Sequence, residues 1–283
     1  MLDVRRGVGS HGAHVCAQPL ERLGIRAGQG LLDLFADVGA VALEHPQEQL
    51  VFVAEGAVQA ALAEGAYVFI TGRRQAELDA AVRELGPNGE GIRTDSSDLA
   101  DLDALYRTIQ QRKARIDVLV ANAGGGVAGP LAEVTEEAFD KTFDTNVKGV
   151  LFTVQNALPL LAEDASVILT GSTTSLRPGP GLGVYSATKA AIRNLARSWI
   201  IELGASGVRV NVLSPGPTNT PGLLGLAPAG QEQALLDAQA AEVPLDRVAD
   251  PAEIANAAIF LATDQSSFVN GVEFFVDGGQ AQI

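Results

Sequence analysis

Short apolar runs alternate with longer amphipathic stretches from about residue 49 to the end of the chain. Several runs, such as residues 118–120 and 167–169, are apolar without a break, which is typical of strands covered on both faces of a parallel sheet. The expected strands are residues 50–53, 66–71, 91–94, 116–121, 166–170, 208–213 and 273–276. Helical patterns fill the intervals, for example at residues 99–114, 136–161, 186–203 and 251–262.

The last of these helices has a clear start signal. Asp250 can cap it, Pro251 occupies its first turn, and Glu253 follows three residues after the cap. Strand–helix alternation with right-handed crossovers predicts an α/β fold, a doubly wound parallel sheet of the Rossmann-like, three-layer αβα kind. Ligands of such sheets bind at the carboxyl ends of the strands.

Two segments depart from this pattern. Residues 1–48 contain all three histidines and the only cysteine and show no alternating strand, although residues 31–43 could form a short amphipathic helix. We therefore divide the chain into an atypical segment, residues 1–48, and a single Rossmann-like domain, residues 49–283. Within that domain residues 217–245 are punctuated by proline and glycine, which predicts a lid or substrate loop.

Composition narrows the classes of function. The formal net charge of −14 argues against nucleic-acid partners and anionic membrane surfaces, since both require a basic face. The single cysteine, Cys16, excludes an internal disulfide framework and fits a reducing compartment. No apolar run reaches the roughly 18 residues of a membrane span, and the first residues lack the apolar core of a signal peptide. We therefore expect a cytoplasmic protein.

Tyr185 and Lys189 carry the first candidate chemistry. They are four residues apart, so on a helix they share one face. A neighbouring ammonium favours the phenolate and is expected to lower the pKa of the tyrosine, which would make it a usable acid or base near neutrality. Ser172 ends the preceding strand, where its hydroxyl could bind a substrate oxygen. The alternatives are a surface lysine beside a packed tyrosine, and a serine that only shapes a turn.

From about residue 61 to the C-terminus the chain resembles a short-chain dehydrogenase/reductase. The motifs occur in order: Ala121-Asn122-Ala123-Gly124, Asn146 within Thr-Asn-Val-Lys-Gly, Ser172, Tyr185-x-x-x-Lys189, Pro215-Gly216-Pro217-Thr218-Asn219-Thr220, and Phe275-Val-Asp-Gly-Gly279. The resemblance implies an oxidoreductase that moves a hydride between a nicotinamide cofactor and a small-molecule alcohol or carbonyl. It also implies a homotetramer or homodimer paired through residues 136–161 and 186–203.

The resemblance implies catalytic roles for four residues. Tyr185 would be the general acid/base, and Lys189 would lower its pKa and hold the nicotinamide ribose. Ser172 would polarise the substrate oxygen. Asn146 would hold a water in a proton relay behind Lys189, or alternatively would only mark a helix kink.

The same resemblance implies a cofactor groove. Asn122, Ala123 and Gly124 would line it, with Asn122 also steadying the sheet. Pro215, Gly216, Thr218 and Thr220 would lie at the nicotinamide, the two threonines contacting its carboxamide. Asp95 and Ser96 would meet the adenine, although Asp95 could instead cap a turn. Hydride transfer needs no metal, and this domain shows no ligand cluster.

The choice of cofactor depends on the end of the strand at residues 66–71. An acidic residue there would bind the ribose 2′-hydroxyl of NAD. Arg73 and Arg74 follow that strand instead, and two guanidinium groups suit the 2′-phosphate of NADP. NADP is therefore the preferred cofactor and NAD the second choice, since surface arginines after a strand are also common.

The family's opening glycine-rich loop is not found in its expected place near residue 56. Gly24-x-x-x-Gly28-x-Gly30 and Gly7-x-Gly9-x-x-Gly12 have suitable spacings, but neither follows an apolar strand. His11, His14 and Cys16 lack a fourth metal ligand. The hypothesis is that residues 1 to about 58 are not the ancestral N-terminus, through a frame change, a misassigned start or a rearrangement. An alternative function follows: a dehydrogenase-like binding or assembly subunit with impaired cofactor binding.

Overall fold

The computed structural model describes residues 66–126 and 128–283. The expectations for the strand at 50–53, the helix at 31–43, the two glycine patterns and the histidine–cysteine group lie outside these residues.

The described strands are all parallel to their neighbours. They are β1 (Val68–Gly72), β2 (Gly89–Arg93), β3 (Ile116–Ala121), β4 (Leu161–Thr170), β5 (Arg209–Pro215) and β6 (Glu273–Val276). They form two hydrogen-bonded groups, β1-β2 and β3-β4-β5-β6, and no described strand joins β1 to β3. The strand expected at residues 50–53 lies outside the described residues, and the parallel arrangement of the described strands agrees with the expected doubly wound sheet. An apolar run predicts that a strand exists, but only the fold decides which strand it pairs with.

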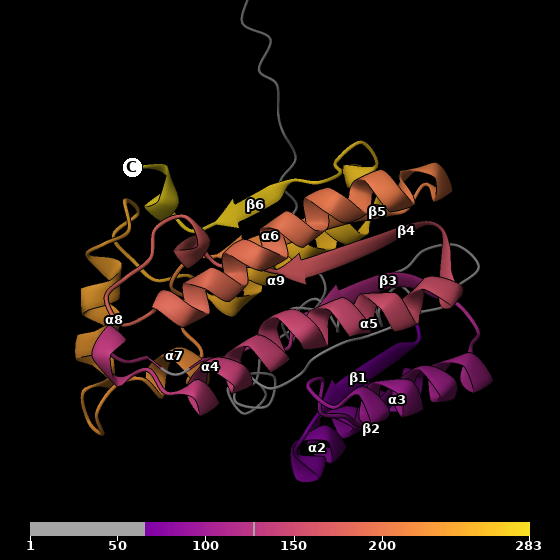
Figure 1. Cartoon of the computed structure of the whole chain (residues 1–283), viewed down its shortest axis with the longest axis horizontal. Helices are drawn as coiled ribbons and strands as arrows, with labels where there is room; N and C mark the ends of the chain where they lie inside the picture. The colour runs from indigo at the N-terminus through magenta and orange to yellow at the C-terminus, as the bar shows by residue number, and fades with distance from the viewer. Residues whose placement is uncertain (1–65, 127) are drawn as a thin grey trace, which may run out of the picture.

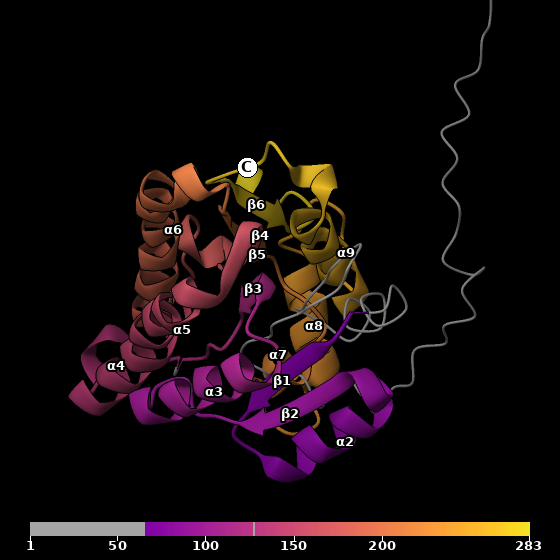
Figure 2. The ribbon, with the colours of Figure 1, turned by 90° about the vertical axis from the view of Figure 1, so that its right-hand side faces the viewer.

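Helices cover both faces of these strands (Figure 2). On one face lie α3 (Leu99–Arg112), α5 (Val150–Ala157) and α6 (Gly183–Leu203), and on the other lie α2 (Gln75–Leu85) and α9 (Pro251–Ala262). The expected three-layer α/β class is confirmed. Burial agrees with it, because every residue of β1 and β3 is buried, as strands covered on both faces require.

The end of the molecule at the carboxyl ends of the strands carries the irregular segments. The expected lid, residues 217–245, contains α7 (Pro221–Leu224) and α8 (Glu232–Ala240). Both lie at the end toward which the arrowheads of β4 and β6 point (Figure 1). The start signal of α9 is confirmed: the Asp250 carboxylate accepts the Ala252 N–H at 2.8 Å, and the Glu253 carboxylate accepts the Asp250 N–H at 2.9 Å.

The helix expected over residues 136–161 is interrupted. It consists of α4 (Glu136–Phe143), a π-helical segment (Asp144–Gly149), α5 and a 3-10 turn (Leu158–Leu160), after which β4 begins. The wide turn places the Asn146 side chain against other segments of the chain and lets Gly149 lie against the Ser96 carbonyl, where a Cβ would be only 2.6 Å away. The apolar period continues through such a turn, so the sequence pattern did not show it.

Candidate active site

Ser172 lies two residues after the end of β4, at the carboxyl edge of the strands, as expected. It opens a 3-10 turn (Thr173–Ser175), and its hydroxyl accepts hydrogen bonds from the Thr174 N–H at 3.2 Å and the Thr174 hydroxyl at 3.0 Å. The side chain therefore shapes the turn and lies at the edge where substrates of this fold bind. The two readings of Ser172 are compatible.

Tyr185 and Lys189 lie one turn apart near the start of α6. The Lys189 ammonium lies 5.6 Å from the centroid of the Tyr185 ring and donates a 2.8 Å hydrogen bond to the Thr170 carbonyl at the end of β4. Lys189 is only 4% exposed, which excludes the alternative of a surface lysine. The bond to Thr170 ties the helix that carries Tyr185 to the strand that ends just before Ser172.

Burial decides the electrostatics of this pair. Burial raises the pKa of Tyr185, and a hydrogen bond with Ser172 acts in the opposite direction without overcoming it. Burial also lowers the pKa of Lys189 to about 8. The expectation that Lys189 lowers the pKa of Tyr185 stays a prediction, and in this structure burial of the phenol acts in the opposite direction.

Asn146 is fully buried in the π-helical segment, and other groups engage its amide. Its Nδ2 donates to the Gly125 carbonyl at 2.8 Å and to the Thr188 hydroxyl at 2.9 Å, and its Oδ1 accepts the Gly125 N–H at 2.9 Å. The Thr188 hydroxyl in turn donates to the Tyr185 carbonyl at 2.6 Å. Asn146 thus marks a helix irregularity and connects the glycine turn after β3 to the helix that carries Tyr185.

The turn after β3 lies directly over the lysine and tyrosine. Asn122 accepts a 2.8 Å hydrogen bond from the Thr170 hydroxyl, which joins β3 to β4 in the steadying role expected of it. Ala123 is half-buried and Gly124 is exposed. A Cβ on Gly124 would lie 3.2 Å from the Lys189 ammonium, and one on Gly126 would lie 3.1 Å from the Tyr185 ring. Side chains at these positions would press on Lys189 and Tyr185, so glycine lets the turn lie close against them.

The residues expected at the adenine lie after β2. The Asp95 carboxylate accepts the Ser97 N–H at 2.9 Å and the Ser97 hydroxyl at 2.6 Å, so it caps a turn. Burial raises the pKa of Asp95, but the Ser97 hydrogen bonds, together with the charges of Arg73 and Lys141, bring it below its usual value. The charge of Arg73 thus acts on the turn that also contains Ser96.

Arg73 and Arg74 are exposed directly after β1. Arg74 forms an ion pair with Glu77 in the first turn of α2. A guanidinium paired on the surface remains able to exchange its partner for a phosphate, because exposed ion pairs contribute little free energy.

The segment after β5 is held against β6 and the lid. Pro215 ends β5, and the Gly216 N–H donates to the Val276 carbonyl at 3.0 Å. The Thr218 hydroxyl donates to the Gly216 carbonyl at 3.0 Å, and Thr220 caps α7 by accepting the Leu223 N–H at 3.3 Å. The two threonines therefore stabilise the start of the lid in this structure.

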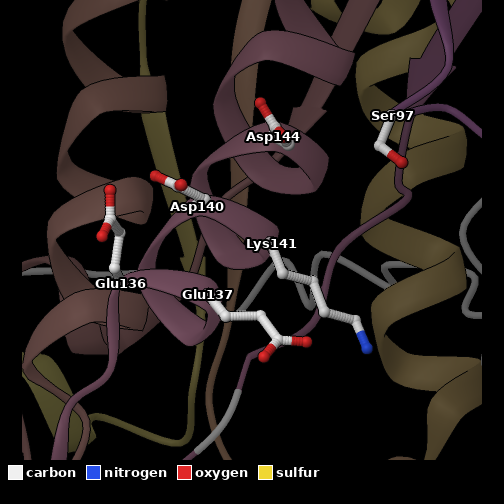
Figure 3. Close-up of a pocket in the computed structure, with 6 residues that line it drawn as sticks. All are labelled: Ser97, Glu136, Glu137, Asp140, Lys141 and Asp144. Carbon is white, nitrogen blue, oxygen red and sulfur yellow. The ribbon is translucent and has the colours of Figure 1, made fainter.

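A cavity of about 550 Å³ lies between α4 and the turn after β2, with the side chains shown in Figure 3. Its charged lining consists of Lys141 and four carboxylates, those of Glu136, Glu137, Asp140 and Asp144. This excess of negative charge disfavours a phosphate-bearing ligand there. Ser172, Tyr185 and Lys189 are not among its lining residues.

Sequence reasoning missed the groups that connect the predicted residues to each other. Thr170 and Thr188 bond to Lys189, Asn122 and Asn146, yet only their nearness to motif residues could have drawn attention to them. Across residues 66–126 and 128–283, no helix is long and apolar enough to cross a membrane. The same residues contain no group of three or more His, Cys, Asp or Glu side chains arranged to hold a metal ion.

The parallel, helix-covered architecture places the protein among Rossmann-fold proteins. The family model described as Enoyl-(Acyl carrier protein) reductase matches residues 53–281. The oxidoreductase asL5 of Sarocladium schorii is 47% identical over 222 residues, covering 78% of this chain and 88% of that protein. The galactitol 2-dehydrogenase of Agrobacterium fabrum is 32% identical over 237 residues, covering 79% and 91%.

Solved structures are also similar to this chain. A blue fluorescent protein from a metagenomic library, in complex with NADPH, matches with a TM-score of 0.73 at 30% identity, covering 80% of this chain and 92% of that one. The chain therefore belongs to the short-chain dehydrogenase/reductase family, a family of NAD(P)-type oxidoreductases.

Proposed function

We propose that this protein transfers a hydride between NADP(H) and a small alcohol or carbonyl compound, with NAD(H) as the second choice of cofactor. One observation carries the proposal: Ser172, Tyr185 and Lys189 come together at the carboxyl edge of the strands, tied by the bond from Lys189 to Thr170. The protein with bound NADPH that matches this chain supports the cofactor class.

The described residues fit the nicotinamide half of such a cofactor. Because Gly124 and Gly126 carry no side chains, none stands between the turn after β3 and Lys189 and Tyr185, which would hold the nicotinamide ribose and the substrate oxygen. The expected place of the family's glycine-rich loop, which would hold the pyrophosphate, lies outside the described residues.

When bound, the nicotinamide supplies a hydride to the carbonyl carbon, or accepts one from the alcohol carbon. In the reducing direction Ser172 and Tyr185 hold the substrate oxygen by hydrogen bonds, and Tyr185 donates its proton to that oxygen as the alcohol forms. In the oxidising direction Tyr185 accepts the proton. The Lys189 ammonium stabilises the negative charge that Tyr185 gains after donating its proton.

Cofactor titration tests the proposal. Thermal shift and fluorescence are followed while NADPH and NADH are added, and turnover is measured with a panel of aldehydes and ketones. Tyr185→Phe is expected to abolish turnover while leaving cofactor binding largely intact, because only the proton donor is lost. Tyr67→Phe is the matched control, since the Tyr67 hydroxyl bonds to Glu90 between β1 and β2. Equal turnover by Tyr185→Phe and the unaltered protein would contradict the proposal.

A second candidate function is that of a dehydrogenase-like binding or assembly subunit. It rests on the glycine-rich loop that is not found in its expected place in the sequence. If neither NADPH nor NADH binds at millimolar concentration, this candidate is favoured and the enzyme proposal fails.

The choice between NADP and NAD has its own test. Arg73→Asp is expected to weaken NADPH and favour NADH, because it replaces a phosphate partner with a hydroxyl acceptor. An unchanged preference would remove Arg73 from the cofactor site.

A further inference from the structure

A buried carboxylate lies next to the 3-10 turn that Ser172 opens (residues 172–175, the serine turn) and takes no part in the proposed chemistry. The Glu273 side chain, at the start of β6, is only 7% exposed. Its Oε1 accepts hydrogen bonds from the Ser175 hydroxyl at 2.7 Å and the Ser214 hydroxyl at 2.9 Å. Its Oε2 lies 3.5 Å from a guanidinium nitrogen of Arg193. A buried carboxylate requires such partners, and here they come from three different elements.

Two of these partners lie next to Ser172. The Ser175 N–H donates to the Ser172 carbonyl at 3.0 Å, so Ser175 closes the turn that Ser172 opens. Ser214, in β5, lies beneath Gly171: a Cβ at Gly171 would be only 2.2 Å from the Ser214 hydroxyl. Glu273 therefore binds both hydroxyl groups: that of Ser175, which closes the serine turn, and that of Ser214, which packs against Gly171 just before the turn.

The third partner lies on the catalytic helix. Tyr185, Lys189 and Arg193 recur every four residues on α6 and so share one face of it. Lys189 reaches Thr170, two residues before Ser172. Arg193 reaches Glu273, which holds Ser175, three residues after Ser172. The serine turn is thus tied to the helix on both sides, once through Lys189 and once through Glu273.

We propose that Glu273 is a positioning residue that fixes Ser172 against the helix carrying Tyr185, by binding Ser175, Ser214 and Arg193 at once. For its effect on turnover, the inference rests on the proposed function. The position of Ser172 relative to Tyr185 matters because both must bind the same substrate oxygen, and a misplacement of about 1 Å can cost about 100-fold in rate.

The experiment compares Ser175→Ala and Glu273→Ala with the conservative variants Ser175→Thr and Glu273→Gln. Kinetics with NADPH and a carbonyl substrate are expected to show kcat lowered about 10-fold to 100-fold in the alanine variants. The KM for NADPH should change little, because the cofactor residues are untouched. Ser175→Thr should restore most of the rate, since it keeps the hydroxyl. Glu273→Gln should fall between, since it keeps an acceptor for the serines and loses the charge facing Arg193.

A second readout does not depend on activity. Hydrogen exchange of the segment at residues 171–177 is expected to be about 10-fold faster in Ser175→Ala and Glu273→Ala, because the turn loses its support. Glu253→Gln is the matched control: it removes a carboxylate that binds Arg247 at the start of α9 and should leave this segment unchanged.

The outcomes separate the two proposals. Unchanged exchange of residues 171–177 in both alanine variants would overturn the positioning role, whatever the kinetics show. An equal loss of kcat in Glu253→Gln would also overturn it, because general destabilisation would then explain the effect. A wild-type protein without turnover but with the expected exchange change would refute the proposed function and leave the positioning role supported.

Discussion

Lys189 should leave a measurable signature in the pH dependence of stability. Its side chain is buried, and burial lowers its pKa from 10.5 to about 8. Shifting a pKa this far corresponds to a cost of about 3 kcal/mol for keeping the ammonium in the folded protein. The cost is fully present below about pH 8, where Lys189 is protonated in both the folded and the unfolded protein. It is gone above about pH 10.5, where Lys189 is neutral in both. Between these values the unfolded state binds more protons, so stability rises with pH.

Lys189→Met isolates this effect. The variant loses the ammonium and its hydrogen bond to the Thr170 carbonyl, a loss of about 1–3 kcal/mol that does not depend on pH. At neutral pH the relief of the burial cost of the ammonium and the loss of this hydrogen bond nearly cancel. The free energy of unfolding of wild type minus that of the variant should therefore increase by about 3 kcal/mol from about pH 8 to about pH 10.5.

The assay is urea unfolding of both proteins at a series of pH values and one protein concentration, so that other titrating groups cancel in the difference. Lys148→Met, at an exposed lysine, is the matched control and should show no such trend. A difference between wild type and Lys189→Met that stays constant with pH would refute the reasoning, because Lys189 would then titrate alike in the folded and unfolded chain.

Three further substitutions test other features. Tyr106→Phe should leave stability unchanged or raise it by up to about 1 kcal/mol in thermal unfolding, because the Tyr106 hydroxyl is buried without a hydrogen-bond partner among the described residues. A clear loss would show that the hydroxyl is satisfied. Glu253→Gln should destabilise by about 1 kcal/mol at neutral pH, a figure reduced because the pair with Arg247 is exposed. The hydrogen bond from Arg247 holds the pKa of Glu253 at about 2, so urea unfolding should show this contribution above the usual pKa of 4.5 and its loss as pH falls toward about 2. Gly171→Ala should cost about 1–3 kcal/mol and lower turnover, because its methyl group would collide with Ser214. Wild-type stability and rate would contradict that packing.

Strand positions followed largely from the sequence because they depend on local apolar runs. The strands β3 and β6 and the helix α9 begin and end at the predicted residues. The strand β4 begins five residues earlier than predicted, at Leu161, and that early part includes the exposed Glu163 and Asp164. This early part of β4 belongs to the strand because Leu161 pairs with Ile116 of β3. That pairing is a long-range contact, which no local pattern encodes.

The candidate site shows the same division. Spacing along the chain was enough to place Tyr185 and Lys189 on one helix face and Ser172 at the end of a strand, because a helix repeat and a strand end are local properties. The direction of the Tyr185 pKa was not accessible in this way, since it depends on how deeply the fold buries the phenol.

Only the tertiary structure decided which distant groups hold the site together. Glu273 lies about a hundred residues from Ser175 in sequence, yet its carboxylate binds that hydroxyl and faces Arg193. Spacing along the chain determined which residue types could share a helix face or a strand edge. Long-range strand order and depth of burial determined their partners and their protonation, because both arise only when the packed layers exclude water.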